Sequence, residues 1–116
     1  MYSVNRSVAI IRPRQPFVDW ANSLPDASAP VRLDSFKEDN LAILIPEYET
    51  PKEAEFYVSE LWKDLFEQKL WNWCTNESWW PTERTLKKFW KWFDAEYHSV
   101  VLDPYEDPIA KEECEE

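Results

Sequence analysis

The absence of glycine is the feature that most restricts the fold of this 116-residue sequence. At ordinary usage of about 7%, a chain of this length would contain about eight glycines. Glycine adopts positive φ without steric penalty, so the two-residue β-hairpin turns that depend on it are not expected. The phosphate-binding loops of P-loop and dinucleotide-binding proteins need glycine where the backbone meets phosphate, which excludes both kinds of site. The nine prolines are therefore expected to separate the helices and strands.

Composition and charge indicate one globular domain with an acidic end. Hydrophobic residues make up 44% of the chain and aromatic residues 16%, enough to build a core. The net charge is −10, of which seven acids and one lysine in residues 103–116 contribute −6 and the remainder of the chain −4. We expect a domain over residues 1–102 and a flexible acidic tail over residues 103–116. The negative charge makes nucleic acid an unlikely partner, and no apolar run is long enough to cross a membrane.

Three apolar runs predict β-strands. Residues 7–12 and 41–45 are rich in aliphatic side chains, end at prolines and suit strands that are buried on both faces. Residues 95–102 alternate and end in β-branched side chains, which predicts a third strand.

Helical spacing predicts three helices between these strands. Residues 16–22 fit a helix of two turns, and residues 31–38 could hold one further turn. Thr50, Pro51 and Glu53 form a capping-box pattern before an amphipathic stripe that runs to about residue 73. Pro81 marks the start of another helix, whose apolar face continues to Phe93.

The resulting order is β-α-β-α-α-β, which predicts an α+β fold. We expect a small mixed three-stranded sheet, covered on one face by a helical hairpin and the short helix. The first helix should connect two parallel strands by a right-handed crossover. The hairpin should return the chain so that the third strand runs antiparallel to the second. Apolar strands with one uncovered face make a homodimer plausible.

The elbow of the hairpin, residues 70–94, contains six of the eight tryptophans. Trp62, Trp73 and Trp90 match the apolar stripes of the two helices and are expected in the core. Four others exceed what those stripes require, and exposed tryptophan in a contiguous patch marks an interaction surface. The predicted binding residues are Trp71, Trp79, Trp80 and Trp92.

Catalytic and metal-binding patterns are weak in this sequence. His98 is the only histidine, and it could act with Cys74 or with carboxylates such as Glu96. An inert, hydrogen-bonded His98 is the simpler interpretation. The ligand spacings of zinc and calcium sites are missing, so we expect no metal and no cofactor. Cys74 and Cys114 are expected to be free thiols, as in a reducing cytoplasm.

Several short patterns resemble a small, uncharacterised family of bacterial proteins. They are Asn5-Arg6-Ser7, Phe17-x-x-Trp20, Trp73-Cys74-Thr75-x-Glu77-Ser78-x-Trp80-Pro81, Phe89-x-x-Trp92-Phe93 and His98-Ser99-x-Val101-x-Asp103. They are spread over most of the chain. The resemblance implies a bacterial, cytoplasmic setting and brings no activity, cofactor or partner with it.

Three functions remain open at this point. The first is a non-enzymatic protein-binding or regulatory module that acts through the tryptophans of the elbow. The second is an acidic inhibitor or antitoxin-like protein whose charge mimics nucleic acid. The third is a small enzyme that uses His98 with Cys74 or nearby carboxylates.

Overall fold

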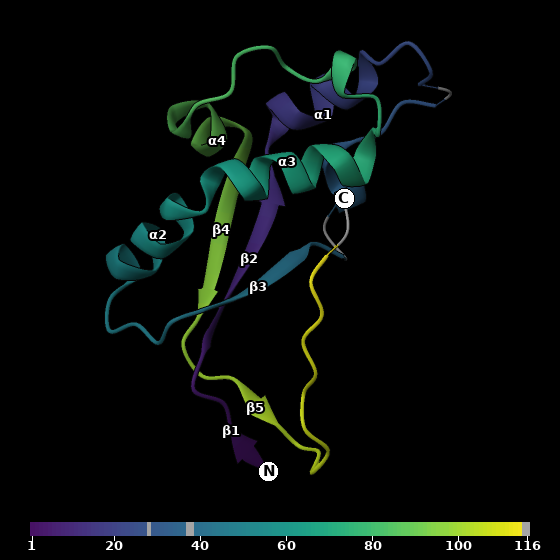
Figure 1. Cartoon of the computed structure of the whole chain (residues 1–116). Helices are drawn as coiled ribbons and strands as arrows, with labels where there is room; N and C mark the ends of the chain where they lie inside the picture. The colour runs from purple at the N-terminus through teal and green to yellow at the C-terminus, as the bar shows by residue number, and fades with distance from the viewer. Residues whose placement is uncertain (28, 37–38, 115–116) are drawn as a thin grey trace.

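The structure, a computed structural model, describes residues 1–27, 29–36 and 39–114. The strands in these ranges are β1 (Tyr2–Ser3), β2 (Ser7–Pro13), β3 (Leu41–Ile45), β4 (Phe93–His98) and β5 (Leu102–Asp103). The helices are α1 (Gln15–Asn22), α2 (Pro51–Glu60), α3 (Trp62–Trp73) and α4 (Leu86–Trp92), with 3-10 turns η1 (Leu33–Phe36) and η2 (Glu77–Trp79). The predicted α+β class is confirmed, with helices packed on a three-stranded sheet (Figure 1).

β2 is the middle strand of this sheet, whose order is β3-β2-β4. Ser7, Ala9, Ile11 and Pro13 are buried on it, and the residues between them are half-buried. Successive side chains of a strand point to opposite faces of its sheet, so one face of β2 is fully covered and the other only partly. Residues 7–12 were predicted to form a strand buried on both faces; this is correct for the face that carries Ser7, Ala9 and Ile11, whereas the other face is only half-buried.

The strand directions differ from the prediction. β2 pairs antiparallel with β3, where Ser7 lies opposite Ile45, and antiparallel with β4, where Val8 lies opposite His98. The sheet is antiparallel and not mixed, and the predicted parallel pairing of residues 7–12 with residues 41–45 is wrong. The reason is the position of α1, which lies beyond the end of β2 instead of across the sheet (Figure 1). The chain therefore enters β3 from the same end at which it left β2.

Helices α2 and α3 (residues 51–73), which we call the α2–α3 arm, carry the chain from one end of the sheet to the other. Such a crossover was predicted for α1. β3 ends at Ile45, at the end of the sheet where β2 begins. The arm then carries the chain along the sheet to the opposite end, where β4 starts (Figure 1). β4 consequently runs in the same direction as β3, with β2 between them. The prediction that the third strand runs antiparallel to the second is wrong for this reason.

The helix predicted over residues 51–73 begins as expected and is interrupted once. Thr50 Oγ1 accepts a hydrogen bond from the Glu53 amide at 3.3 Å, and Pro51 occupies the first turn. The Glu53 carboxylate accepts a hydrogen bond from Tyr57 Oη at 3.3 Å, which is not the reciprocal bond of a full capping box. At Leu61 φ is −100° and ψ is 9°, outside the helical region. The chain changes direction there between α2 and α3 (Figure 1), and buried residues of both helices, such as Val58 and Phe66, belong to the same core.

The second predicted helix is shorter than expected at both ends. α4 begins at Leu86 and not near Pro81, and Thr85 Oγ1 caps it by accepting from the Lys88 amide at 3.1 Å. Phe93 has extended dihedral angles, φ −137° and ψ 154°, and is the first residue of β4. Its side chain is fully buried. A buried phenylalanine suits the apolar face of a helix and the first position of a strand equally well. The helical spacing of apolar residues therefore placed the end of α4 too late, at Phe93 instead of Trp92.

The two ends of the domain meet in a second, smaller sheet. β1 and β5 pair antiparallel, with Tyr2 opposite Asp103, and the Val4 amide donates to the Val101 carbonyl at 3.0 Å. From residue 104 to residue 114 the chain is exposed and forms no helix or strand. The division into a domain over residues 1–102 and a tail over residues 103–116 stays a prediction.

The core lies between the helices and one face of the sheet. Its largest fully buried side chains include Phe17, Phe66, Phe89 and Phe93. Within residues 1–27, 29–36 and 39–114, no helix lies on the opposite face of the sheet, where Leu44 is 48% exposed (Figure 1).

Candidate functional site

Trp80 is a structural residue of the elbow. It is only 7% exposed, and its Nε1 donates to the Cys74 carbonyl at 2.8 Å. Asn76 Oδ1 accepts from the Ser78 amide at 3.1 Å and caps η2, the turn that folds Trp80 back under the end of α3. The expectation that Trp80 lies on the surface is therefore wrong.

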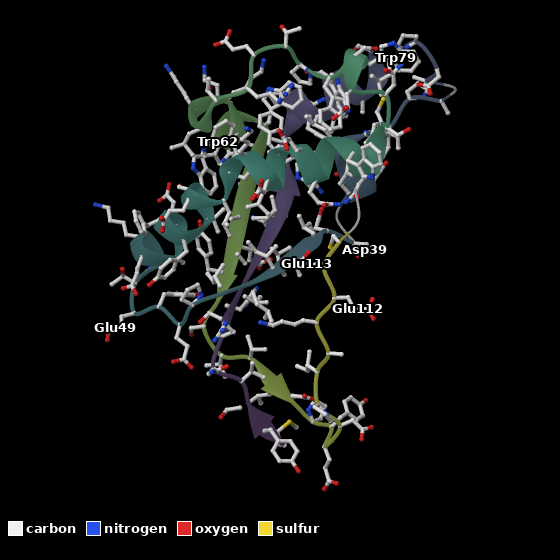
Figure 2. All side chains as sticks on the ribbon, viewed as in Figure 1. Asp39, Glu49, Trp62, Trp79, Glu112 and Glu113 are labelled. Atoms are coloured by element: carbon white, nitrogen blue, oxygen red, sulfur yellow. The ribbon has the colours of Figure 1, made fainter. Side chains whose placement is uncertain are left out.

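Trp79 and Trp92 are half-buried; the Trp79 backbone is bonded to Trp20, and the Trp92 ring contacts other aromatic rings. Trp79 lies at the same end of the molecule as α1 (Figure 2), and its carbonyl accepts from Trp20 Nε1 at 3.0 Å, which ties the elbow to α1. The Trp92 ring lies 6.2 Å from that of Trp20 and 5.6 Å from that of Phe66. The Lys88 ammonium lies 5.6 Å from the Trp92 centroid, which covers the ring further. Neither residue presents an isolated exposed ring.

Trp71 and Trp73 lie in the last turn of α3. Trp71 is half-buried against the core, whereas Trp73 is 40% exposed and is the only one of the eight tryptophans in the exposed class. The expectation that Trp73 is a core residue is wrong, because α3 ends there and leaves one side of the ring uncovered. The exposed tryptophan is therefore Trp73, which was not among the four predicted binding residues.

A pocket of about 440 Å³ opens beside Trp73. This volume lies within the roughly 300–1,000 Å³ typical of ligand pockets. Phe36, on η1, lies 5.4 Å from the Trp73 ring and 5.8 Å from the Phe17 ring, measured between centroids. Phe17 is 2% exposed and forms a fixed wall. We call this the α3 pocket; the lining residues that matter below are Phe17, Phe36, Asp39, Asn40, Lys69 and Trp73.

Two polar groups in the α3 pocket are incompletely satisfied. Lys69 is half-buried with its Nζ 5.9 Å from the Phe17 centroid, and it makes no ion pair within 4.0 Å among the described residues. Burial lowers the pKa of Lys69, and the negative charge of Asp39 acts in the opposite direction. Asn40 Oδ1 is buried and has no hydrogen-bond partner in the described part of the chain. A buried acceptor without a partner costs roughly 1–3 kcal/mol, so a rotation of the Asn40 amide that brings Oδ1 to a donor would be favourable.

The sequence contained one signal for this pocket that the predictions did not use. Lys69 and Trp73 are four residues apart and therefore share one face of their helix. Phe36, Asp39 and Asn40 come from a segment whose pattern gave no link to that helix. Only the folded chain brings η1 and the start of β3 against the end of α3.

The basic–aromatic face of α4 is a second feature of the elbow region. A pocket of about 310 Å³ there is lined by Thr85, Lys87, Lys88, Lys91 and Trp92, together with Glu83. Trp90 is half-buried, and its Nε1 donates to Ser59 Oγ at 3.0 Å, which joins α4 to α2.

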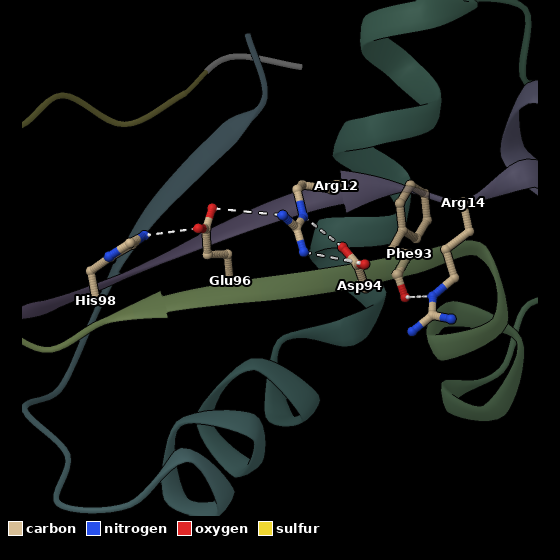
Figure 3. Close-up of polar contacts among 6 residues, drawn as sticks. All are labelled: Arg12, Arg14, Phe93, Asp94, Glu96 and His98. Atoms are coloured by element: carbon tan, nitrogen blue, oxygen red, sulfur yellow. Dashed lines mark hydrogen bonds and ion pairs between the residues drawn. The ribbon is translucent and has the colours of Figure 1, made fainter. Parts of the chain in front are cut away.

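His98 is the last residue of β4 and Cys74 directly follows α3; the ends of these two elements lie well apart, so the structure does not bring the residues together (Figure 1). Cys74 is 7% exposed, and its Sγ lies 3.7 Å from the Asn76 carbonyl oxygen. His98 is exposed, with Nε2 3.5 Å from Glu96 Oε1 (Figure 3). Cys74 and Cys114 are both free thiols in the structure.

His98 belongs to a row of polar and charged side chains on the open face of the sheet, the others being Arg12, Asp94 and Glu96. Arg12 Nε donates to Asp94 Oδ1 at 2.9 Å, and Arg12 Nη1 lies 3.8 Å from Glu96 Oε2 (Figure 3). The Arg12 and Asp94 side chains are 43% and 37% exposed. Exposed pairs of this kind contribute about 0–1 kcal/mol each. The row therefore keeps this part of the sheet solvated and adds little to stability.

The described residues contain neither a candidate metal site nor a candidate membrane span. In those ranges no three His, Cys, Asp or Glu side chains are grouped so that they could hold a metal ion. None of the described helices combines the length and apolar character that a membrane crossing needs.

Comparison of the chain with models of known protein families, with curated proteins and with solved structures finds no match in any of the three. The chemistry of the α3 pocket is therefore the basis for a functional proposal.

Proposed function

We propose that this protein is a non-enzymatic binding module that recognises a protein partner through the α3 pocket. The observation that carries the proposal is the exposed Trp73 ring, which forms one wall of a pocket shared with Phe17 and Phe36. Tryptophan in a pocket is the side chain most enriched among the residues that dominate binding energy at protein interfaces. The proposed surface differs from the one expected from the sequence, because none of the four predicted tryptophans is among the described residues that line the α3 pocket.

The wall of the pocket is held in place before any ligand arrives. The Phe17 ring lies 5.4 Å from Trp20, 5.4 Å from Phe93 and 6.3 Å from Trp92. Side chains that are already ordered lose little conformational entropy on binding. Trp92 thus contributes to the site by packing against Phe17. Direct contacts of Trp71 and Trp79 with a partner stay predictions.

The net charge and the free thiols support two further parts of the proposal. A charge of −10 opposes binding to a nucleic-acid backbone, so the partner that we propose is a protein. Two free thiols fit a cytoplasmic location. A second copy of the chain over the open face of the sheet, and an acidic-inhibitor role of the tail, both stay predictions. Sedimentation equilibrium tests the former and deletion of residues 104–116 the latter.

The proposal is tested by selecting peptides from two random libraries, one displayed with free C-termini and one with free N-termini. The target is the full chain, and Trp73→Ala is the variant that removes the exposed wall of the α3 pocket. Phe56→Ala is the matched control, because Phe56 is 59% exposed on α2 and does not line the pocket. Far-UV circular dichroism confirms that both variants keep their secondary structure.

We expect enriched peptides that bind the wild type and Phe56→Ala equally and bind Trp73→Ala at least tenfold more weakly. The proposal is overturned if neither library yields enriched peptides. It is also overturned if the enriched peptides bind Trp73→Ala as tightly as they bind Phe56→Ala.

A further inference from the structure

We infer that the α3 pocket binds the C-terminal residue of its partner, with the free carboxylate at Lys69 and an apolar side chain against the aromatic rings. This inference rests on the proposed function and adds the chemical class of the bound segment.

The charge of Lys69 is the first reason. Its ammonium is half-buried beside the Phe17 ring, and no carboxylate of the described chain lies within ion-pair distance. Burial without a close partner is unfavourable for an ammonium, as the lowered pKa of Lys69 reflects. A carboxylate brought by a ligand would compensate for that loss with a charge-assisted hydrogen bond.

Asn40 is the second reason. Its Oδ1 lacks a donor, and it lies in the sequence directly beside Asp39 at the edge of the same pocket. The last peptide bond of a bound chain carries an N–H group close to the terminal carboxylate. Because Oδ1 is closed to solvent in the empty pocket, the Asn40 amide has to turn to accept that N–H. A peptide terminus thus supplies both the acceptor that Lys69 lacks and the donor that Asn40 lacks.

The aromatic walls are the third reason. Phe17, Phe36 and Trp73 pack on one another at centroid distances of 5.4–6.3 Å and together form one apolar side of the pocket of about 440 Å³. A pocket lined by apolar rings with a few polar groups orients a ligand by its polar end and gains affinity from its apolar end. An apolar C-terminal side chain such as phenylalanine or leucine has both features.

The test is an NMR titration of the 15N-labelled full chain that follows the tryptophan indole N–H signals. The first probe is the peptide acetyl-Ala-Ala-Ala-Ala-Phe with a free carboxylate, and the second is the same peptide with a C-terminal carboxamide. A third probe, acetyl-Ala-Ala-Glu-Ala-Phe carboxamide, carries its negative charge inside the sequence. The expected result is a shift of the Trp73 indole signal, with a Kd for the free carboxylate at least tenfold lower than for either carboxamide.

Two variants assign that preference to one side chain. Lys69→Met keeps the apolar stem and removes the charge, so its Kd for the free carboxylate should rise tenfold to a hundredfold. Lys63→Met removes the same charge from an exposed position on the same helix and should leave the Kd within twofold of the wild-type value.

Three results overturn the inference. They are equal binding of the free carboxylate and a carboxamide, no Trp73 shift with any probe at millimolar concentration, and equal losses in Lys69→Met and Lys63→Met. Each of them leaves the proposed function to the library selection, where internal or N-terminal peptides that depend on Trp73 would still support it.

Discussion

Replacing Trp80 by alanine should destabilise the protein by about 3–5 kcal/mol, although Trp80 lies in the stretch whose tryptophans resemble a binding surface. A buried tryptophan hides roughly 150–250 Å², which at about 25 cal/mol per Å² amounts to about 4–6 kcal/mol. Trp80 is 7% exposed and so retains nearly all of this contribution. The alanine that remains keeps part of this area, and core Trp→Ala replacements typically cost about 3–5 kcal/mol, a large share of the roughly 5–15 kcal/mol that stabilises a typical domain.

Two further variants separate the parts of this effect. Trp80→Phe keeps most of the apolar area but removes the hydrogen bond from Nε1 to the Cys74 carbonyl, and should cost about 1–2 kcal/mol. Trp73→Ala removes an exposed ring and should cost less than about 1 kcal/mol.

The measurement is equilibrium unfolding in urea followed by far-UV circular dichroism, with free energies compared at a common m value. The distinction between a structural Trp80 and an exposed Trp73 is refuted if Trp73→Ala loses as much stability as Trp80→Ala. It is equally refuted if Trp80→Ala loses less than about 1 kcal/mol.

Two other predictions concern Tyr97 and the cap of α4. Burial raises the pKa of Tyr97 from 10.0 to about 12, with the charge of Glu55 adding to the shift. The folded state therefore favours the neutral phenol; its stabilising effect is complete below pH 10 and is lost as the pH rises towards 12. The difference in urea midpoint between the wild type and Tyr97→Phe should fall across that window, and a constant difference would contradict the assignment. Thr85→Ala removes the cap of α4 and should lower the free energy of unfolding by about 1 kcal/mol. The control Thr82→Ala, in an exposed loop, should change the free energy of unfolding by less than about 0.5 kcal/mol. Equal losses in the two variants would show that the cap is not responsible.

The sequence by itself determined the features that depend on neighbouring residues. Thr50 and Pro51 start α2 where the capping pattern places it, since capping uses only backbone groups within one turn. The run at residues 41–45 forms β3, and the turn expected within residues 31–38 appears as η1. Residues 37–38 of that segment lie outside the described residues. Helix type, strand type and the α+β class followed from these local signals.

Only the tertiary structure decided the directions of the strands and the location of the candidate site. Strand direction depends on where α1 packs, and α1 is held at the end of the sheet by contacts such as Trp20 Nε1 with the Trp79 carbonyl. The exposure of Trp73 and the burial of Trp80 depend on how η2 folds back under α3. The α3 pocket joins Lys69 to Phe36 and Asn40, which lie far from it along the chain. Helical spacing records which residues share a face, but it carries no information about which distant segment will cover that face.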